Sequence, residues 1–163
     1  MVIIVFGLPG TGKTYFSEHL SESIGAVHLN TDKLRIEYDK TGEYDEETKN
    51  FIYNQLKNEM VKNIANSNDV IVDGTFHRKE NRKAFEVEIS RQGVNAFFIE
   101  VKAKEETIKQ RLKNNRKYSE AGYEVYLKIK QNFDAYEKDH LTLWSDSQDV
   151  KDMIKKAKQY IYE

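Results

Sequence analysis

Five short apolar runs alternate with helix-patterned segments along the chain. The runs have the length of buried strands and cover residues 2–6, 26–29, 69–73, 94–101 and 141–144. Apolar residues recur at helical spacing in the segments 13–24, 52–64, 79–92, 104–114, 122–138 and 147–161. Strands that alternate with helices in this way are typical of βαβ units. The pattern therefore predicts an α/β fold, a three-layer domain with a parallel five-stranded sheet.

Length and composition narrow the class of protein. A chain of 163 residues is the size of one α/β domain, so we expect residues 1–163 to form a single domain. The sequence contains no cysteine, which excludes thiol catalysis, disulfides and cysteine metal sites and fits a cytoplasmic protein. The first apolar run is too short for a signal peptide or a membrane span, and we expect no membrane association.

Charge is balanced overall but uneven along the chain. The net charge is −1, which argues against tight non-specific binding of long nucleic acid. The stretch from Lys102 to Lys117, however, holds seven Lys or Arg residues against two Glu. Such a stretch can be a solvated helix face or a phosphate-binding lid, and its composition leaves both open.

The turn after the first strand carries the pattern G-x-x-x-x-G-K-[ST], from Gly7 to Thr14. Its glycines allow backbone N–H groups to approach phosphate oxygens, and the following helix offers its positive end to the same anion. Lys13 is expected to reach the β- and γ-phosphates of ATP, and the Thr14 hydroxyl to ligate Mg²⁺. The predicted nucleotide-binding residues are Gly7, Pro9, Gly10, Thr11, Gly12, Lys13 and Thr14.

Asp73 ends the apolar run of residues 70–72 in the manner of a Walker B strand. A carboxylate at this point holds Mg²⁺ directly or through a water, near the threonine of the phosphate loop. The alternative is an ordinary strand-end Asp that caps the next turn. Together with the phosphate loop, the pattern favours Asp73 as a metal ligand.

Asp32 and Arg35 follow the second predicted strand, where ligands of a parallel sheet collect. Asp32 is placed to accept the proton of an attacking hydroxyl, and Arg35 to bind an anionic group of the acceptor. The alternative is that Thr31 or Asp32 only caps a helix and that Arg35 pairs with Glu37 or Asp39.

Arginines further along the chain are candidates for phosphate contacts. Arg111 and Arg116 lie in the basic stretch, at the end of a predicted helix, where a closing lid could bring them to the transferred phosphoryl group. Arg82 follows Asp73 and is a candidate ligand of the acceptor, with His77 and Arg78 lining the same cleft. A guanidinium suits these positions because its planar fork matches a phosphate.

These residues together resemble the small P-loop kinases that include polynucleotide 5′-hydroxyl kinases, zeta-toxin-like kinases and AAA-type predicted ATPases. The segment from Asn30 to Arg35 resembles that family's D-x-x-R motif, and Asp73-Gly74-Thr75 with the later Arg82 is similar to its Asp-x-Thr strand end. The resemblance implies a P-loop fold with a helical lid at about 111–122. It implies that Asp32 is the general base, Arg35 and Arg82 bind the acceptor, and Arg111 and Arg116 bind the nucleotide.

We therefore expect a kinase that uses ATP and Mg²⁺ and transfers the γ-phosphate to a hydroxyl of a nucleic-acid 5′ end or a small metabolite. The alternative is a P-loop ATPase or nucleotide-dependent switch whose phosphoryl acceptor is water. A guanine-specific switch usually carries Asn-Lys-x-Asp, which does not occur in the sequence. No obligate protein partner is evident. The intact Lys13, Thr14, Asp32 and Asp73 argue against a non-catalytic binding module.

Overall fold

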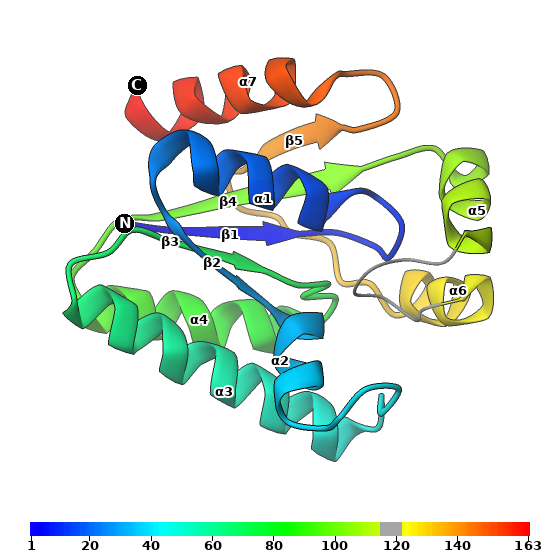
Figure 1. The fold of residues 1–163 in the computed structure, drawn as a ribbon, viewed down its shortest axis with the longest axis horizontal. Coiled ribbons are helices and arrows are strands. Elements are labelled where there is room, and N and C mark those ends of the chain that lie inside the picture. Colours follow the sequence, from blue (N-terminus) through cyan, green and yellow to red (C-terminus); the bar gives the residue numbers. More distant parts are fainter. Residues whose placement is uncertain (115–121) are drawn as a thin grey trace.

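A parallel sheet of five strands, in the order β2-β3-β1-β4-β5, forms the centre of the part of the chain that the structure describes (Figure 1). The computed structural model describes residues 1–114 and 122–163. The strands are β1 (Val2–Phe6), β2 (Val27–Asn30), β3 (Val70–Asp73), β4 (Ala96–Lys102) and β5 (Leu141–Trp144). The predicted α/β class and the parallel five-stranded sheet are confirmed.

Helices cover both faces of the sheet. They are α1 (Lys13–Ile24), α2 (Thr31–Glu37), α3 (Glu46–Ala65), α4 (Lys79–Arg91), α5 (Glu105–Lys113), α6 (Tyr123–Gln131) and α7 (Val150–Tyr162). Figure 1 shows α1 and α7 on one face, α3 and α4 on the other, and α2, α5 and α6 near the carboxyl end of the sheet. No helix in the described part of the chain has both the length and the apolar composition needed to cross a bilayer.

The side-chain alternation of β1 explains the two-sided core. Its central residues are fully buried, as expected for a parallel strand covered on both faces. Ile3 and Val5 pack with the α1 and α7 side chains, whereas Ile4 and Phe6 pack with those of α3 and α4. Each face of one strand therefore anchors a different layer of helices.

Strand register brings the ends of β1, β2 and β3 to one place. Val5 of β1 lies opposite Asp73 of β3, and Asn30 of β2 lies opposite the same Asp73. Strand β1 is central in the sheet, and β3 lies beside it. The loops after these strands consequently share one edge of the sheet, where an open α/β fold binds its ligands.

The ends of two helices depend on contacts that periodicity does not contain, and α3 begins at Glu46, earlier than the predicted residue 52. The helix expected over 122–138 ends at Gln131, and the chain beyond it packs Phe133 and Tyr136 against the core without helical geometry. The last helix begins at Val150, not at residue 147, because Asp149 is its cap and accepts a hydrogen bond from Asp152 N at 2.8 Å. Periodicity located both helices, but a side-chain cap and a tertiary contact set their ends.

Candidate active site

The loop after β1 depends on glycine at defined positions. At Gly7, which has a φ of 145°, an added Cβ would lie 2.3 Å from the Val101 carbonyl oxygen. At Gly10, with a φ of 89°, it would lie 2.7 Å from Ile108 Cγ2. Both distances are shorter than any tolerated contact, and both backbones are costly for other residues. The loop therefore keeps its shape, close to β4 and α5, only with these glycines.

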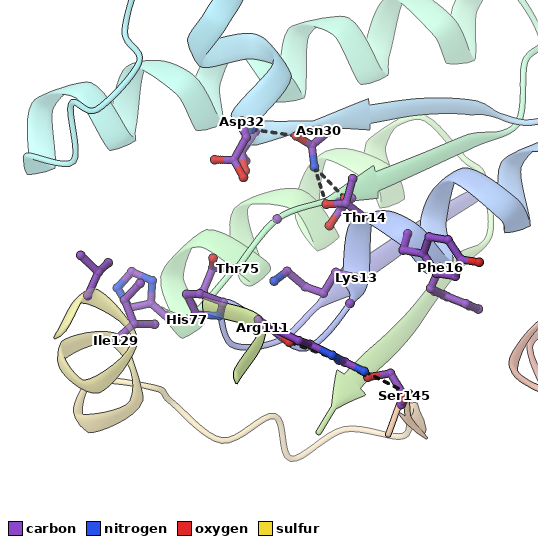
Figure 2. Close-up of a pocket in the computed structure, with 18 of the residues that line it drawn as sticks. Lys13, Thr14, Phe16, Asn30, Asp32, Thr75, His77, Arg111, Ile129 and Ser145 are labelled. Atoms are coloured by element: carbon purple, nitrogen blue, oxygen red, sulfur yellow. Dashed lines mark hydrogen bonds between the residues drawn. The ribbon is translucent and has the colours of Figure 1, made fainter. Parts of the chain in front are cut away.

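Lys13 is the first residue of α1, and its side chain turns back over the loop. Its Nζ donates to the Leu8 carbonyl oxygen at 3.0 Å, and the Thr11 hydroxyl donates to the same oxygen at 2.9 Å. Figure 2 shows the Lys13 side chain pointing into the cavity toward Thr75. The ammonium group and the N-terminus of α1 thus lie on one side of a single cavity, the arrangement needed for an anionic ligand.

Thr14 and Asp73 are joined by Asn30. The Asn30 Nδ2 donates to Asp73 Oδ2 at 2.6 Å and to Thr14 Oγ1 at 3.2 Å (Figure 2). Asp73 is fully buried, and its other oxygen, Oδ1, has no hydrogen-bond partner among the described residues. A buried carboxylate oxygen without a partner is costly unless a cation or a water satisfies it. The site therefore fits a divalent cation at this oxygen.

The charge state of Asp73 suits a metal ligand. Burial by itself raises the pKa of Asp73, but a hydrogen bond from His28 and the positive charge of Lys13 outweigh it and hold the pKa below its usual value. The described residues hold no group of three His, Cys, Asp or Glu that could bind a metal by themselves. Thr14 and Asp73 would be the protein ligands of a Mg²⁺ ion here, and the ion would supply positive charge for a bound phosphate.

Asp32 lies at the start of α2, and it is not the helix cap. That role belongs to Asn30, whose Oδ1 accepts from Asp32 N at 2.9 Å and from Lys33 N at 3.0 Å. The Asp32 carboxylate lines the cavity and lies 3.4 Å from Arg35 Nη1. The alternative interpretation, in which Thr31 or Asp32 caps the helix, is therefore wrong.

Arg35 is almost completely buried at 7% exposure, yet it lines the cavity. Its Nε donates to the Glu43 carbonyl oxygen at 3.4 Å, and its guanidinium carbon lies 4.9 Å from the centre of the Tyr44 ring. Arg35 therefore contacts Glu43, Asp32 and Tyr44, and not Glu37 or Asp39 as the alternative interpretation had it. Arg35 is consequently fixed in place beside Asp32.

Arg82 does not lie in the cavity, and this corrects its sequence-based assignment to the acceptor. The side chain is 1% exposed and its guanidinium donates to the carbonyl oxygens of Phe76, Asp134 and Ala135 at 2.7, 2.6 and 3.2 Å. Arg82 shares the buried face of α4 with Phe85 and Ile89, at helical spacing. That spacing was the signal in the sequence that Arg82 points into the core.

Arg111 reaches the phosphate loop from α5. Its Nη1 donates to Gly10 O at 3.2 Å and to Ser145 Oγ at 2.8 Å, and its Nη2 donates to Ser145 O at 3.3 Å (Figure 2). The Ser145 hydroxyl in turn donates to Thr11 O at 2.5 Å. Arg116, the other predicted lid arginine, lies outside the described residues, as does most of the segment predicted as the lid.

Sequence reasoning missed Ser145, Asn30 and Tyr53. Ser145 directly follows β5, and Asn30 ends β2, so their position at the carboxyl edge of the sheet was a usable signal. Tyr53 lies in the middle of α3, where its spacing indicated only burial. Its hydroxyl accepts a hydrogen bond from Phe76 N at 2.9 Å, and burial raises its pKa to about 12. Tyr53 is therefore neutral at physiological pH.

One cavity of about 660 Å³ contains both ends of the site. The end beside the phosphate loop is lined by Arg111, Ser145, Gln148, Val150 and Met153. The other end is lined by Asp32, Arg35, Tyr44, Lys49, Tyr53, His77, Val125 and Ile129. Figure 2 shows Lys13 between Asp32 on one side and Arg111 on the other. Two ligands can therefore meet at Lys13 from opposite ends.

A family model described as an AAA domain matches residues 2–136. The chain belongs to the AAA domain family. The sequence-based recognition of an AAA-type P-loop domain is thereby confirmed, while the match does not separate the polynucleotide kinase and zeta-toxin-like groups. Within this AAA domain, the matched range includes the phosphate loop, Asp32, Asp73 and Arg111.

Two curated relatives match the AAA domain over part of its length. A Saccharolobus solfataricus protein that is named among the adenylate kinases is 40% identical over 73 residues, which are 44% of this chain and 39% of the relative. The adenylate kinase of Malacoplasma penetrans is 36% identical over 84 residues, which are 45% of this chain and 39% of that enzyme. The matched stretch thus spans about two fifths of the length of these relatives.

Solved structures share the fold over almost the whole chain. The APS kinase CysC of Mycobacterium tuberculosis, in complex with AMPPNP and APS, superposes with a TM-score of 0.77 at 12% identity, covering 99% of this chain and 97% of that chain. Chaetomium thermophilum Kti12 in complex with ADP-AlF3 gives a TM-score of 0.70 at 16% identity, covering 100% of both chains. These likenesses show the fold of the AAA domain.

Proposed function

We propose that the protein is a kinase that transfers the γ-phosphate of ATP to a hydroxyl group, in the presence of Mg²⁺. The observation that carries the proposal is Asp32, a carboxylate that lines the cavity opposite the phosphate loop and has no capping role. The names of relatives and structural neighbours, which include adenylate, APS and sugar kinases, support a phosphotransferase. Residues 1–163 act in this proposal as one domain, with a lid at about 111–122.

In the reaction, the loop amides and Lys13 bind the triphosphate and orient its γ-phosphorus toward Asp32. Thr14 and Asp73 would hold the Mg²⁺ ion, which would supply positive charge beside the phosphate oxygens. The acceptor hydroxyl gives its proton to the Asp32 carboxylate, its oxygen forms a bond to phosphorus, and the bond to the β-phosphate oxygen breaks to release ADP. Arg111, which lies at the loop, stabilises the equatorial oxygens or the leaving phosphate.

Adenylate kinase is the second candidate, because the curated relatives carry that name. A phosphate acceptor has little use for a base at neutral pH, and the Asp32 carboxylate would repel its oxygens. Asp32 therefore favours an alcohol over a nucleoside monophosphate. Water as the acceptor, the case of an ATPase or switch, is the remaining alternative.

The test is an assay with ATP labelled in its γ-phosphate. We expect label to appear on an alcohol, more slowly on water, and not on AMP. A panel of small alcohols and of oligonucleotides with free 5′ hydroxyls identifies the acceptor. Transfer to AMP that survives Asp32→Asn would support the adenylate kinase alternative. Label released only as inorganic phosphate with every acceptor would favour the ATPase.

A further inference from the structure

Two cationic side chains from different helices line the acceptor end of the cavity. Arg35 comes from α2 and Lys49 from the first turns of α3, and the imidazole of His77 joins them from the loop after β3. The proposed mechanism uses none of the three for chemistry, since proton transfer needs only Asp32. Cationic and hydrogen-bonding side chains that come together at a cavity wall suit the binding of an anion.

Arg35 is fixed before any ligand arrives. It is held through the Glu43 carbonyl, Asp32 and the Tyr44 ring, so that its planar donors keep one orientation. A guanidinium that is ordered in advance loses less conformational entropy when it binds an oxyanion.

Lys49 faces the cavity although it also has an ion-pair partner. Its Nζ lies 3.2 Å from Glu46 Oε1, and its side chain is 24% exposed against 68% for Glu46. Lys62 makes the same pair with Glu59 on the same helix, yet it does not line the cavity. An exposed i,i+3 pair contributes little, so Lys49 can exchange Glu46 for a ligand at small cost.

His77 contributes a hydrogen bond and no charge. Burial is the main cause that lowers the pKa of His77, with Lys49 and Arg78 acting in the same direction against Glu46 and Asp134. The neutral imidazole offers one donor and one acceptor. Figure 2 shows the ring beside Ile129 of α6, at the apolar wall of the acceptor end.

We propose that Arg35, Lys49 and His77 form an anion subsite, so that the acceptor is a small alcohol that carries a phosphate or carboxylate group. That the acceptor is an alcohol rests on the proposed function, whereas the binding of an anion at these three residues does not. The anion binds at Arg35 and Lys49, and the hydroxyl of the same molecule lies at Asp32. A cation pair beside a base thus selects a charged alcohol over a neutral one.

The surroundings favour a small molecule over a nucleic-acid strand. The turn that leads into Lys49 contains the acidic residues Asp45, Glu46 and Glu47. The hydrogen bond and the charge of Lys49 are the main causes that lower the pKa of Glu46, and Arg78 acts in the same direction, so a carboxylate stands close to this end of the cavity. An extended polyanion would meet these carboxylates, whereas a single phosphate or carboxylate would not.

The binding experiment uses inorganic phosphate as a probe, with the nucleotide site saturated by Mg²⁺ and AMPPNP so that the phosphate loop is occupied. Calorimetry compares the wild type with Lys49→Met, Lys49→Gln and the matched control Lys62→Met. We expect both Lys49 variants to bind phosphate about tenfold more weakly and Lys62→Met to bind as the wild type does. Equal binding by all four proteins, or no binding by the wild type, would overturn the subsite.

Kinetics then separate the subsite from the kinase proposal. Glycerol 3-phosphate and glycerate are compared with neutral glycerol, and an oligonucleotide with a free 5′ hydroxyl is a further arm. We expect the charged alcohols to be preferred, and Lys49→Met to raise their KM about tenfold with little change in kcat. Lys49-dependent phosphate binding without any transfer would refute the kinase and leave the subsite. Preference for glycerol or for the oligonucleotide would overturn the acceptor class proposed here.

Discussion

The side-chain amide of Asn30 donates a 2.6 Å hydrogen bond to the carboxylate of Asp73. The same amide donates to Thr14, and its oxygen caps α2, the helix that carries Asp32. One side chain thereby connects the two proposed metal ligands with the proposed base. The Asn30 amide nitrogen donates two hydrogen bonds, and its oxygen accepts two from backbone N–H groups of α2, so the whole amide is hydrogen-bonded.

Asn30→Asp tests this connection because it keeps the capping oxygen and removes the donor. The new carboxylate would lie against Asp73, and the repulsion is expected to lower the transfer rate on the order of 10- to 100-fold and to raise the Mg²⁺ requirement. Asn30→Ala should instead also remove the cap and destabilise the protein by about 1 kcal/mol. Rates measured against Mg²⁺ concentration, together with thermal melting, distinguish the two variants. An Asn30→Asp protein with wild-type Mg²⁺ dependence would refute the connection.

Lys13→Ala is expected to weaken MgATP binding by roughly 10- to 100-fold, the effect of losing a charged donor to phosphate. The fold should survive, because the loss of the partly buried hydrogen bond from Lys13 to Leu8 O costs only about 1 kcal/mol. Calorimetric titration with MgATP provides the measurement, and Lys155→Ala on the exposed side of α7 is the control. Tight MgATP binding by the Lys13 variant would count against the nucleotide site.

Asp32→Asn separates a kinase from a nucleotide-binding protein. The change preserves size and removes the proton acceptor, so transfer should fall by a factor on the order of 10² to 10⁴. The ATP dissociation constant should stay within a few-fold and the melting temperature should hardly change, because Asn30 and not Asp32 caps α2.

Asp45→Ala is the matched comparison for Asp32→Asn. Asp45 caps α3 and accepts from Thr48 N at 2.9 Å, so its loss should lower the stability by about 1 kcal/mol and leave the rate per folded molecule unchanged. If Asp32→Asn behaves like Asp45→Ala, with lower stability and normal turnover, then Asp32 is not the base.

Arg82→Met should destabilise the protein by about 3 kcal/mol or more, because it leaves three buried carbonyl oxygens without their donor. The control Arg91→Met, on the same helix and 74% exposed, should change the stability little. Denaturant unfolding measures both. An unchanged stability of Arg82→Met, with a raised acceptor KM, would restore Arg82 to the acceptor site.

The raised pKa of Tyr53 predicts that the free energy of unfolding depends on pH in the alkaline range. Its pKa is raised to about 12 in the folded protein, so between pH 10 and 12 the folded state holds a proton that the unfolded state has lost. The free energy of unfolding should therefore fall with rising pH in this window, by about 1.4 kcal/mol per pH unit from this group. In Tyr53→Phe the free energy of unfolding should fall less steeply with pH, because the titrating hydroxyl is absent. Urea unfolding of both proteins at several pH values measures the difference. Parallel slopes for the two proteins would contradict the assignment.

The sequence predicted those parts of the site that local geometry determines. The glycine pattern fixes the phosphate loop, and the end of a buried strand fixes Asp73, because both follow from a few adjacent residues. Arg82 and Ser145 depend instead on contacts with segments more than 50 and more than 130 residues away. Contacts with these distant segments decide whether an arginine faces a cavity or buried carbonyl oxygens. The sequence of the helix that carries the arginine does not reveal such contacts.

The loop after β3 passes through a left-handed residue, Phe76, with a φ of 47°. A bulky side chain adopts this conformation at a cost of about 1–2 kcal/mol, and here its fully buried ring, packed edge-on against Tyr53 and Phe85, compensates. The reversal sends Phe76 into the core, while Thr75 and His77 on either side of it line the cavity. The packing of Phe76 in the folded core thus offsets the cost of this backbone conformation. The wall of the cavity consequently has its shape before the acceptor binds.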